Sequence, residues 1–500
     1  MTSINSDFMS QLALRSLGNS SNMMTQAMER LSTGKRVNSA ADDAAGLGIA
    51  TKLKAQVNSL NAASRNATDA LALIGTIDGA LEESSEILLR MRELAVQSAS
   101  DTNTGTDRSF IQDEINQLNN ELNRISSSTE FNSVKLLDGT YNNKQIQIGT
   151  SANQVFNIGV TSTDAATLGA YQMESLAEHN AAATADAAAA VTASDLLINV
   201  GANYSVKGSF GSTTVNVAAG DDAKTVAQSF NLAAGTTGIT AAAITKAKIT
   251  SVSAETYSFT LKGKSATAST VNATVTSATN LTALKDAINS VSGATGITAA
   301  LTEDLSGVNL VQQDGFDIVV GDVTSSGSGT MTMGAADKNG DAVSQAAVAL
   351  GGATGTDSQV IIGQISLSSH KAFTVTSGNA ANHFTTDTNA KTSALETMGA
   401  VDISSQTGAT NALSVIDGAI AMISEVRSEM GAAENRLTST VDNLSNVSVN
   451  TQRSLTAVED ANFASETSAL TKAQILQQAA TSMLAQANKA KQTMLVLLQG

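Results

Sequence analysis

The 500-residue sequence contains no cysteine and no proline, and aromatic residues make up only 3% of it. Without cysteine there can be no disulfide, no thiolate metal site and no cysteine nucleophile. Without proline there is no slow cis/trans isomerisation step, and long helices have no built-in breakers. The scarcity of aromatic residues predicts cores made of small and aliphatic side chains.

Positive charge is also scarce. The net charge is −16, and no arginine occurs between Arg124 and Arg427. Nucleic-acid binding needs clustered Lys and Arg, so we expect no nucleic-acid partner.

No stretch approaches 18 consecutive apolar residues, and the first residues lack a basic segment followed by an apolar run. We therefore expect neither a membrane span nor a cleavable signal peptide.

Both ends of the chain carry a heptad pattern, in which apolar residues recur at alternating steps of three and four. This spacing keeps one apolar seam on one side of an α-helix. Near the N-terminus the pattern comprises Leu14, Leu17, Ser21, Met24, Met28 and Leu31. Near the C-terminus it comprises Leu476, Ala480, Met483, Ala487, Ala490, Met494 and Leu497. Each seam is weak alone, which favours pairing of the two ends with each other and with other copies of the protein.

Helical periodicity continues inward from both ends. It predicts helices over residues 47–98, about 110–125, beyond Thr410, and from a start between Glu459 and Glu466. Residues 144–160 alternate apolar and polar side chains, which predicts a short β-hairpin.

The middle of the chain has a different character, with alternating strands and short amphipathic helices. The string TGITA occurs at Thr237–Ala241 and again at Thr295–Ala299, a period of 58 residues. Val226, Phe230 and Asn231 correspond to Leu284, Ile288 and Asn289 in the second copy. We interpret these segments as a tandem repeat near residues 195–320, with TGITA opening the return strand of each unit.

Candidate chemistry in the sequence is sparse. The three histidines have no metal-ligand spacing, and the serines have no GxSxG elbow. Asp337, Asn339 and Asp341 have the spacing of the first calcium-loop ligands, but Ala342 and Val348 replace the glycine and glutamate that such a loop requires. A turn at Asn339-Gly340 fits better. We therefore expect no enzyme activity, no metal and no cofactor.

Several long segments resemble the bacterial flagellins. They are LSTGKRVNSAADDAAGLGIA at residues 31–50, RMRELAVQSA at 90–99, TEFNSVKLLDG at 129–139, IQIGTSANQ at 146–154, and AVEDANFASETSALTKAQILQQAATSMLAQAN at 457–488. The resemblance covers roughly the first 170 and the last 100 residues. The middle resembles, more loosely, the insertion motif of some flagellins and hook-associated proteins.

The resemblance implies a structural subunit that polymerises into the flagellar filament for swimming motility. Such a subunit would be exported unfolded through the flagellum's own channel, without a cleavable signal peptide, and assembled at the extracellular tip. Its partners would be further copies of itself, an export chaperone, and the cap and hook-junction proteins. The resemblance also carries Arg90, Leu94 and Glu114 onto positions that contact Toll-like receptor 5 in recognised flagellins. Arg90 and Leu94 are one helical turn apart and can face the same way, and the alternative is a role in contacts between subunits.

The fold class we expect is multidomain α plus α+β. Residues 1–44 with 456–500 would form a terminal coiled-coil domain, the inner layer. Residues 45–175 with 400–455 would form a helical domain with a β-hairpin, the middle layer, and 176–399 an inserted β-rich outer region. The expected subunit-interface residues are Leu14, Leu17, Met24, Met28, Leu31, Leu476, Met483, Met494 and Leu497.

Three other functions stay open. A hook-associated junction protein would share the terminal helices, a secreted filament could use its insert as an adhesin, and a filament insert could be catalytic. The close matches at residues 31–50 and 457–488 favour the filament subunit, and no acid, base and metal set supports catalysis.

Overall fold

A computed structural model describes residues 8–175, 179–182, 202–218, 220–302, 305–340, 347–351, 357–378, 384 and 389–499. The chain forms two compact units. The first unit comprises Met1–Gly75, Asn143–Gly159 and Gly431–Gly500. The second unit comprises Thr76–Asn142 and Val160–Met430. Two long helices, α2 and α8, each contribute residues to both units.

The helical parts confirm the sequence prediction. Long helices form here because their apolar residues recur at helical spacing and no proline interrupts them. Helix α3 begins with a capping box, in which the Thr104 side chain and the Asp107 side chain each accept a hydrogen bond from the other residue's backbone N–H. The bounds are α1 Phe8–Thr33, α2 Ala44–Ser98, α3 Gly105–Ser128, α8 Gln406–Glu459 and α9 Phe463–Gln499.

Helix α8 contains an 18-residue window with a mean hydropathy of 1.2, so by length and composition alone it could cross a membrane. A single helix of this kind is weak evidence for membrane insertion, and 39% of the window is buried inside the protein. Ile416 and Ile423 are among its buried residues. We therefore interpret the apolar face of α8 as part of the protein's own core.

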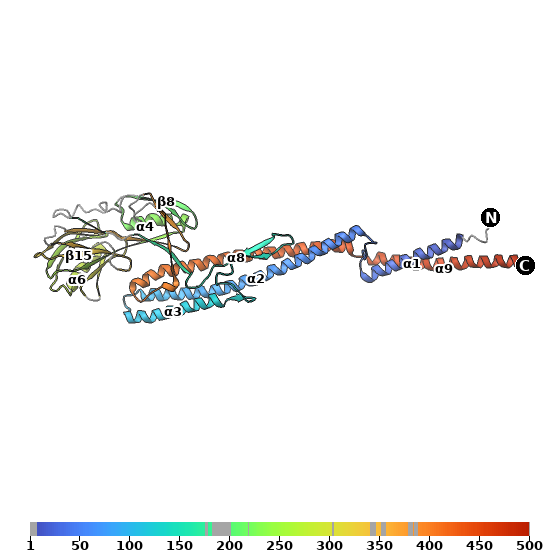
Figure 1. The fold of residues 1–500 in the computed structure, drawn as a ribbon, viewed down its shortest axis with the longest axis horizontal. Helices are drawn as coiled ribbons and strands as arrows, with labels where there is room; N and C mark the ends of the chain where they lie inside the picture. The colour runs from blue at the N-terminus through green and yellow to red at the C-terminus, as the bar shows by residue number, and fades with distance from the viewer. Residues whose placement is uncertain are drawn as a thin grey trace. The chain divides into compact units, whose positions relative to one another are not determined.

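In the first unit, α1 and α9 lie side by side and run antiparallel (Figure 1). The predicted hairpin is present as β3 (Lys144–Gln147) paired with β4 (Val155–Ile158). The side-chain amide of Asn66 on α2 donates a hydrogen bond to the Gln147 carbonyl, and Arg436 on α8 stacks over the Phe156 ring. These contacts hold the hairpin against the part of α2 and α8 that belongs to this unit.

The second unit holds the β-rich region, and every strand pair described in it is antiparallel. One sheet has the order β11-β10-β14-β17-β6, and another has the order β12-β13-β9-β18-β5-β21, with β15 pairing both β9 and β16. A third sheet has the order β20-β19-β7-β8, and β1 pairs β2. The strands are β1 Glu130–Phe131, β2 Val134–Lys135, β5 Gly169–Glu174, β6 His179–Ala182, β7 Ala202–Lys207, β8 Ser212–Val217, β9 Thr240–Thr250, β10 Thr256–Lys262, β11 Ser269–Thr274, β12 Ile297–Leu301, β13 Val308–Gln312, β14 Ile318–Ser325, β15 Met331–Ala336, β16 Val348–Leu350, β17 Ser358–Ile361, β18 Gln364–Ser369, β19 Thr374–Ser377, β20 Lys391–Thr392 and β21 Ala394–Thr397. A 3-10 turn, η3, spans Met398–Ala400.

The predicted tandem repeat is confirmed in atomic detail. Helix α4 (Ala223–Leu232) and the short α5 (Ala234–Thr237) precede β9, and α6 (Thr282–Ser290) and α7 (Ser292–Thr295) precede β12 in the same way. The Asn231 side chain donates a hydrogen bond to the Ala241 carbonyl and accepts one from the Ala241 N–H. Asn289 makes the same two hydrogen bonds with Ala299. The glycine of each TGITA string closes a helix in the left-handed conformation, where φ is +74° at Gly238 and +70° at Gly296.

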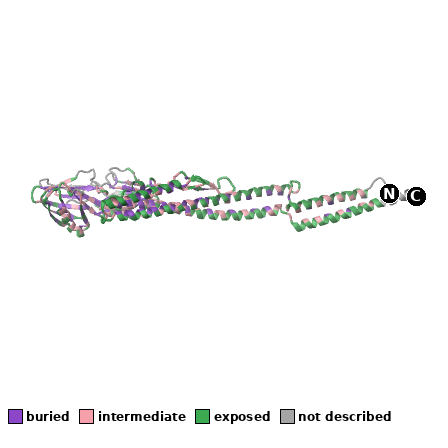
Figure 2. Ribbon diagram, turned by 90° about the horizontal axis from the view of Figure 1, so that it is seen from below, coloured by how far each residue is buried: buried purple, intermediate pink, exposed green. Residues whose placement is uncertain are grey.

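Burial differs between regions of the chain. The cores of the second unit are lined by aliphatic side chains and a few aromatic rings, including Tyr204, Phe230, Tyr257 and Phe259. Where their side chains are described, helices α1 and α9 are mostly exposed or half-buried (Figure 2). The terminal helices therefore have little core of their own.

Candidate assembly surface of the terminal helices

Helices α1 and α9 face each other along two heptad seams in which small residues alternate with larger ones. The small side chains let the two helices approach closely. On α1 the buried or half-buried positions include Ala13, Leu17, Ser20, Ser21, Met24, Ala27 and Leu31. On α9 they include Leu470, Ala473, Gln477, Ala480, Leu484 and Ala487.

This register differs from the predicted one. Leu17, Met24 and Leu31 lie on the buried face as expected, but Leu14 and Met28 do not: their side chains are 53% and 48% exposed. On α9, Leu476 and Met483 are 39% and 60% exposed. Ser21, Ala480 and Ala487, which the predicted seams also include, are buried or half-buried. Met494 and Leu497 lie outside the side chains that the structure describes.

Large apolar side chains also remain exposed around both helices, and we call them together the outer face of the pair. On α1 it includes Leu14, Met23 and Met28, and on α9 it includes Phe463, Ile475, Leu476 and Met483. A shallow and mostly apolar hollow lies along α9, lined by Phe463, Ala464, Thr467, Thr471, Ile475 and Leu476 among others. Large apolar side chains left in water on adjoining turns mark an interaction surface.

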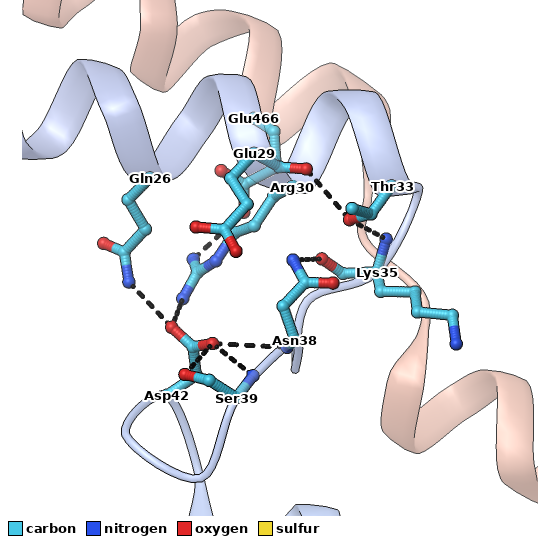
Figure 3. A network of polar contacts seen from close by, with 9 residues as sticks. All are labelled: Gln26, Glu29, Arg30, Thr33, Lys35, Asn38, Ser39, Asp42 and Glu466. Atoms are coloured by element: carbon cyan, nitrogen blue, oxygen red, sulfur yellow. Dashed lines mark hydrogen bonds and ion pairs between the residues drawn. The ribbon is translucent and has the colours of Figure 1, made fainter.

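A polar network joins the two helices where α1 ends. Arg30 Nη1 lies 3.3 Å from Glu466 Oε1 on α9, and Arg30 Nη2 lies 4.0 Å from Asp42 Oδ1 in the loop that follows α1. Figure 3 shows the Arg30 guanidinium between these two carboxylates. One arginine therefore ties together α1, α9 and the loop that leads to α2.

Asp42 organises that loop. Its carboxylate accepts hydrogen bonds from the backbone N–H groups of Asn38 (3.2 Å) and Ser39 (2.9 Å), from the Ser39 hydroxyl, and from the Gln26 amide at 3.3 Å (Figure 3). The pKa of Asp42 is lowered, chiefly by the Ser39 backbone N–H and then by Gln26. The loop is thus held by an ionised carboxylate.

The backbone also joins the ends. Lys35 and Asp460 form an isolated antiparallel bridge, and Arg36 N donates to the Glu459 carbonyl at 2.7 Å. The Lys35 ammonium also pairs with the Glu459 carboxylate. These contacts bring the end of α1 and the start of α9 together where the chain enters and leaves the pair.

The second predicted set lies in the second unit. Arg90 on α2 is exposed, and its Nε donates to Glu114 Oε1 on α3 at 3.0 Å. The hydrogen bonds that Arg90 donates, first to Glu93 and then to Glu114, raise the pKa of Arg90. Leu94, however, is only 1% exposed. Leu94 therefore lies on the core side of α2, one turn from exposed Arg90.

The sequence did not reveal the ion pairs between distant helices. Arg92 on α2 pairs with Asp417 on α8 at 2.6 Å, and Arg427 on α8 pairs with Asp78 on α2 at 2.9 Å. The members of each pair are more than 300 residues apart, and no local pattern marks them. Only the folded arrangement of α2 and α8 brings them together.

The expected turn at Asn339-Gly340 is present. Gly340 N donates to the Asp337 carbonyl at 2.9 Å, Asn339 N donates to Asp337 Oδ1, and φ of Gly340 is +88°. Asp341 lies outside the described residues. Across the part of the chain that the structure describes, no group of three or more His, Asp or Glu side chains could hold a metal ion.

Comparison with known proteins gives matches at both ends and in the middle. Residues 4–142 match the bacterial flagellin N-terminal helical region, residues 413–498 match the C-terminal helical region, and residues 258–314 match the flagellin hook IN motif. The motif match covers the second repeat unit.

Similar proteins include the B-type flagellin of Pseudomonas aeruginosa, 35% identical over 499 residues and 99% of each chain. The flagellin of Salmonella typhimurium is 33% identical over 517 residues and 99% of each chain. Among solved structures, FliC from Burkholderia pseudomallei is 18% identical, with a TM-score of 0.29 over 73% of this chain and 99% of that one. The hook-associated protein-3 of Legionella pneumophila is 13% identical, with a TM-score of 0.34 over 82% and 99%. Structural scores this low carry no argument, whereas the sequence identity spans whole chains. On that full-length similarity, this chain belongs to the bacterial flagellins, the structural subunits of the flagellar filament.

Proposed function

We propose that the paired helices α1 and α9 are the polymerising part of this filament subunit, and that neighbouring copies cover their outer face. The observation that carries this proposal is the set of large apolar side chains that the pair leaves exposed, which includes Leu14, Met28, Leu476 and Met483. Burying a large apolar side chain completely contributes about 1.5–3 kcal/mol. Several such side chains in each subunit, repeated along a polymer, supply the driving force for assembly.

The proposed organisation has three layers. Residues 1–44 with 456–500 form the inner layer, residues 45–175 with 400–455 form the middle layer, and residues 176–399 project outward. The role is purely structural, without a catalytic step.

The experiment that tests this function is polymerisation of the purified full-length chain, followed by sedimentation and electron microscopy. Leu476→Ser with Met483→Ser removes two outer-face side chains without touching the inward seam. This double variant should lose filament growth and keep the melting temperature of the second unit. Gln478→Ser with Gln486→Ser, at exposed polar positions of the same helix, is the matched control and should polymerise normally. Filaments of normal length from the Leu476/Met483 variant would contradict the proposal.

Export of the unfolded chain agrees with the pairing of the two chain ends in α1 and α9. The subunit is secreted unfolded through the flagellum's own channel and joins the extracellular filament at its tip, with an export chaperone, the cap and the hook-junction proteins as partners. Support comes from the Arg30–Glu466 pair, whose members are 436 residues apart. Closing so long a loop has a large entropic cost, so the ends pair only after the whole chain is available. Co-purification of the secreted chain's partners, with and without residues 476–500, tests the chaperone contact.

Arg90 and Glu114 form the proposed contact with Toll-like receptor 5, and Leu94 supports it from the core. Arg90 is exposed and held by two carboxylates, so its guanidinium is pre-positioned for a partner. Truncating an arginine anchor in an interface costs about 2 kcal/mol or more, and Arg90→Ala should weaken receptor activation by monomers at least about tenfold. Arg92→Ala, which removes a neighbouring ion-paired arginine, is the control. Unchanged activation by Arg90→Ala would leave Arg90 with an intersubunit role alone.

A further inference from the structure

The methionines of this chain are divided between two environments. Six of them are buried and at most 4% exposed: Met91, Met173, Met331, Met333, Met398 and Met430. Met24 and Met422 are half-buried. The exposed methionines among the side chains that the structure describes are Met23 at 47%, Met28 at 48% and Met483 at 60%. All three belong to the terminal helix pair.

We propose that Met23, Met28 and Met483 are oxidation sites, and that conversion of their thioethers to sulfoxides blocks assembly of the subunit. This inference rests on the proposed polymerising role of α1 and α9. It adds sites of modification, and a class of reagent that modifies them, to the outer face through which the subunit is proposed to polymerise.

The chemistry needs a two-electron oxidant such as hydrogen peroxide. The thioether sulfur attacks one peroxide oxygen, the O–O bond breaks, and the other oxygen leaves as water after taking up the proton of the transferred oxygen. Sulfur is oxidised by two electrons and the peroxide is reduced by two. The chain has no cysteine, so no thiol competes, and exposure decides which methionines react.

The physical effect of this reaction is local. A sulfoxide turns a flexible apolar side chain into a polar one with a strong hydrogen-bond acceptor. A neighbouring copy that covers the outer face would have to desolvate this acceptor, which is unfavourable without a donor. Water covers the three sulfoxides in the monomer, so the fold of the monomer is unaffected. The buried methionines of the second unit are shielded, so that unit keeps its packing.

The position of the three methionines makes their oxidation depend on whether the subunit is free or assembled. In the free subunit the three thioethers face water, whereas in a polymer the next copies cover them. Free subunits are therefore the sensitive form, and assembled filaments are protected. A methionine sulfoxide reductase, which restores the thioether, returns an oxidised subunit to the assembly-competent form.

The test treats purified full-length monomer with hydrogen peroxide, maps added oxygen on tryptic peptides by mass spectrometry, and measures polymer yield by sedimentation. Met23, Met28 and Met483 should gain oxygen first, the circular dichroism melt of the monomer should stay unchanged, and polymer yield should fall at least tenfold. Treatment of preformed filaments should leave the three sites largely unoxidised.

The matched variant is Met23→Leu with Met28→Leu and Met483→Leu, which keeps apolar volume and removes the reactive sulfur. It should polymerise after peroxide treatment as well as before it. If leucine itself disturbs assembly, incubation of oxidised wild-type monomer with a methionine sulfoxide reductase supplies the second measurement and should restore polymer yield.

The possible failures are distinguishable. Untreated wild-type chain that does not polymerise would refute the proposed function. Wild-type chain that carries sulfoxides at all three sites and still polymerises would refute the oxidation inference alone. Loss of assembly in the peroxide-treated leucine variant would assign the effect of peroxide to other residues. This result would also refute the oxidation inference.

Discussion

Arg30 Nη1 and Glu466 Oε1 lie 3.3 Å apart, although 436 residues separate them in the sequence. Both side chains are partly buried, and Asp42 lies 4.0 Å from the same guanidinium. The contact fixes how far α1 is slid along α9, because a shift of one turn would separate the charges by about 5.4 Å. A single ion pair thus helps to set the register of a helix pair whose seams repeat small and large side chains in alternation.

Arg30→Gln should loosen that register. Charge-assisted hydrogen bonds contribute about 1.5–3 kcal/mol, so backbone amides in α1 and α9 should exchange faster with deuterium, while amides in the second unit exchange at the wild-type rate. Arg15→Gln, an exposed arginine of the same helix, is the control. Equal exchange in the two variants would mean that the seam alone sets the register.

Deletion of residues 476–500 should separate folding from assembly. It removes Ala480, Leu484 and Ala487 from the inward seam, together with the outer-face Met483. Short isolated helices are marginal in water, so the unpaired part of α1 should lose helicity. We expect no filament growth and a nearly unchanged melting temperature of the second unit. Long filaments of the truncated chain, seen by electron microscopy, would disprove the role of the pair.

Leu94→Ala should destabilise the second unit. Leu94 is 1% exposed on a helix whose Leu88 and Met91 are also buried, and truncation of a buried leucine costs about 2–5 kcal/mol. Val96→Ala on the same helix, where the valine is exposed, should change stability by less than about 0.5 kcal/mol. Urea unfolding of the two variants measures the difference. A similar midpoint for both would place Leu94 outside the core.

Asp317 should make the second unit sensitive to pH. Its Oδ1 atom is buried and has no hydrogen-bond partner in the described structure. Burial, and then the nearby Asp222 carboxylate, raise its pKa from 3.8 to about 7 against the opposing effects of the Gly363 N–H and Lys262. The stabilisation from neutral Asp317 is therefore complete below pH 3.8 and is lost as the pH rises through about 7.

Asp317→Asn keeps this side chain neutral at every pH. The variant should be more stable than wild type at pH 8 by about 1–3 kcal/mol, and the difference should shrink toward zero as the pH falls to about 4. Thermal melts across that range provide the measurement. A pH-independent difference would show that Asp317 does not titrate there.

The paired hydrogen bonds of Asn231 and Asn289 should contribute unequally to stability, although both residues bond their backbone partners in the same way. Asn289 is partly buried, whereas Asn231 is exposed. Asn289→Ala leaves the Ala299 backbone groups with poorer access to water and should cost about 1–3 kcal/mol. Asn231→Ala should cost about 1 kcal/mol or less, because water can replace its two hydrogen bonds. Denaturant midpoints of the two single variants provide the comparison, and a larger loss from Asn231→Ala would contradict this account.

The sequence alone determined the long helices, the hairpin and the two repeat units. Apolar spacing predicted the helices, alternation predicted the hairpin at 144–160, and the TGITA strings placed the two repeat units 58 residues apart. These features are local, since the period of a pattern follows from helix or strand geometry. The long segments at the two ends also indicated the family, because a match between sequences does not depend on contacts in the fold.

Only the tertiary structure decided which side of each helix is buried. A heptad of Leu and Met at 14, 28, 476 and 483 indicates an apolar stripe, but it cannot say whether the partner is the other end of the chain or another copy. The pair closed on Ala27 and Ala473 together with Leu17, Met24 and Leu31, and it left Leu14, Met28, Leu476 and Met483 exposed. Leu94 is a further example: it is one turn from exposed Arg90, and only the fold shows that it lies on the core side of α2. Contacts such as Arg30 with Glu466 depend on chain segments that only folding brings together, and no local pattern of residues encodes them.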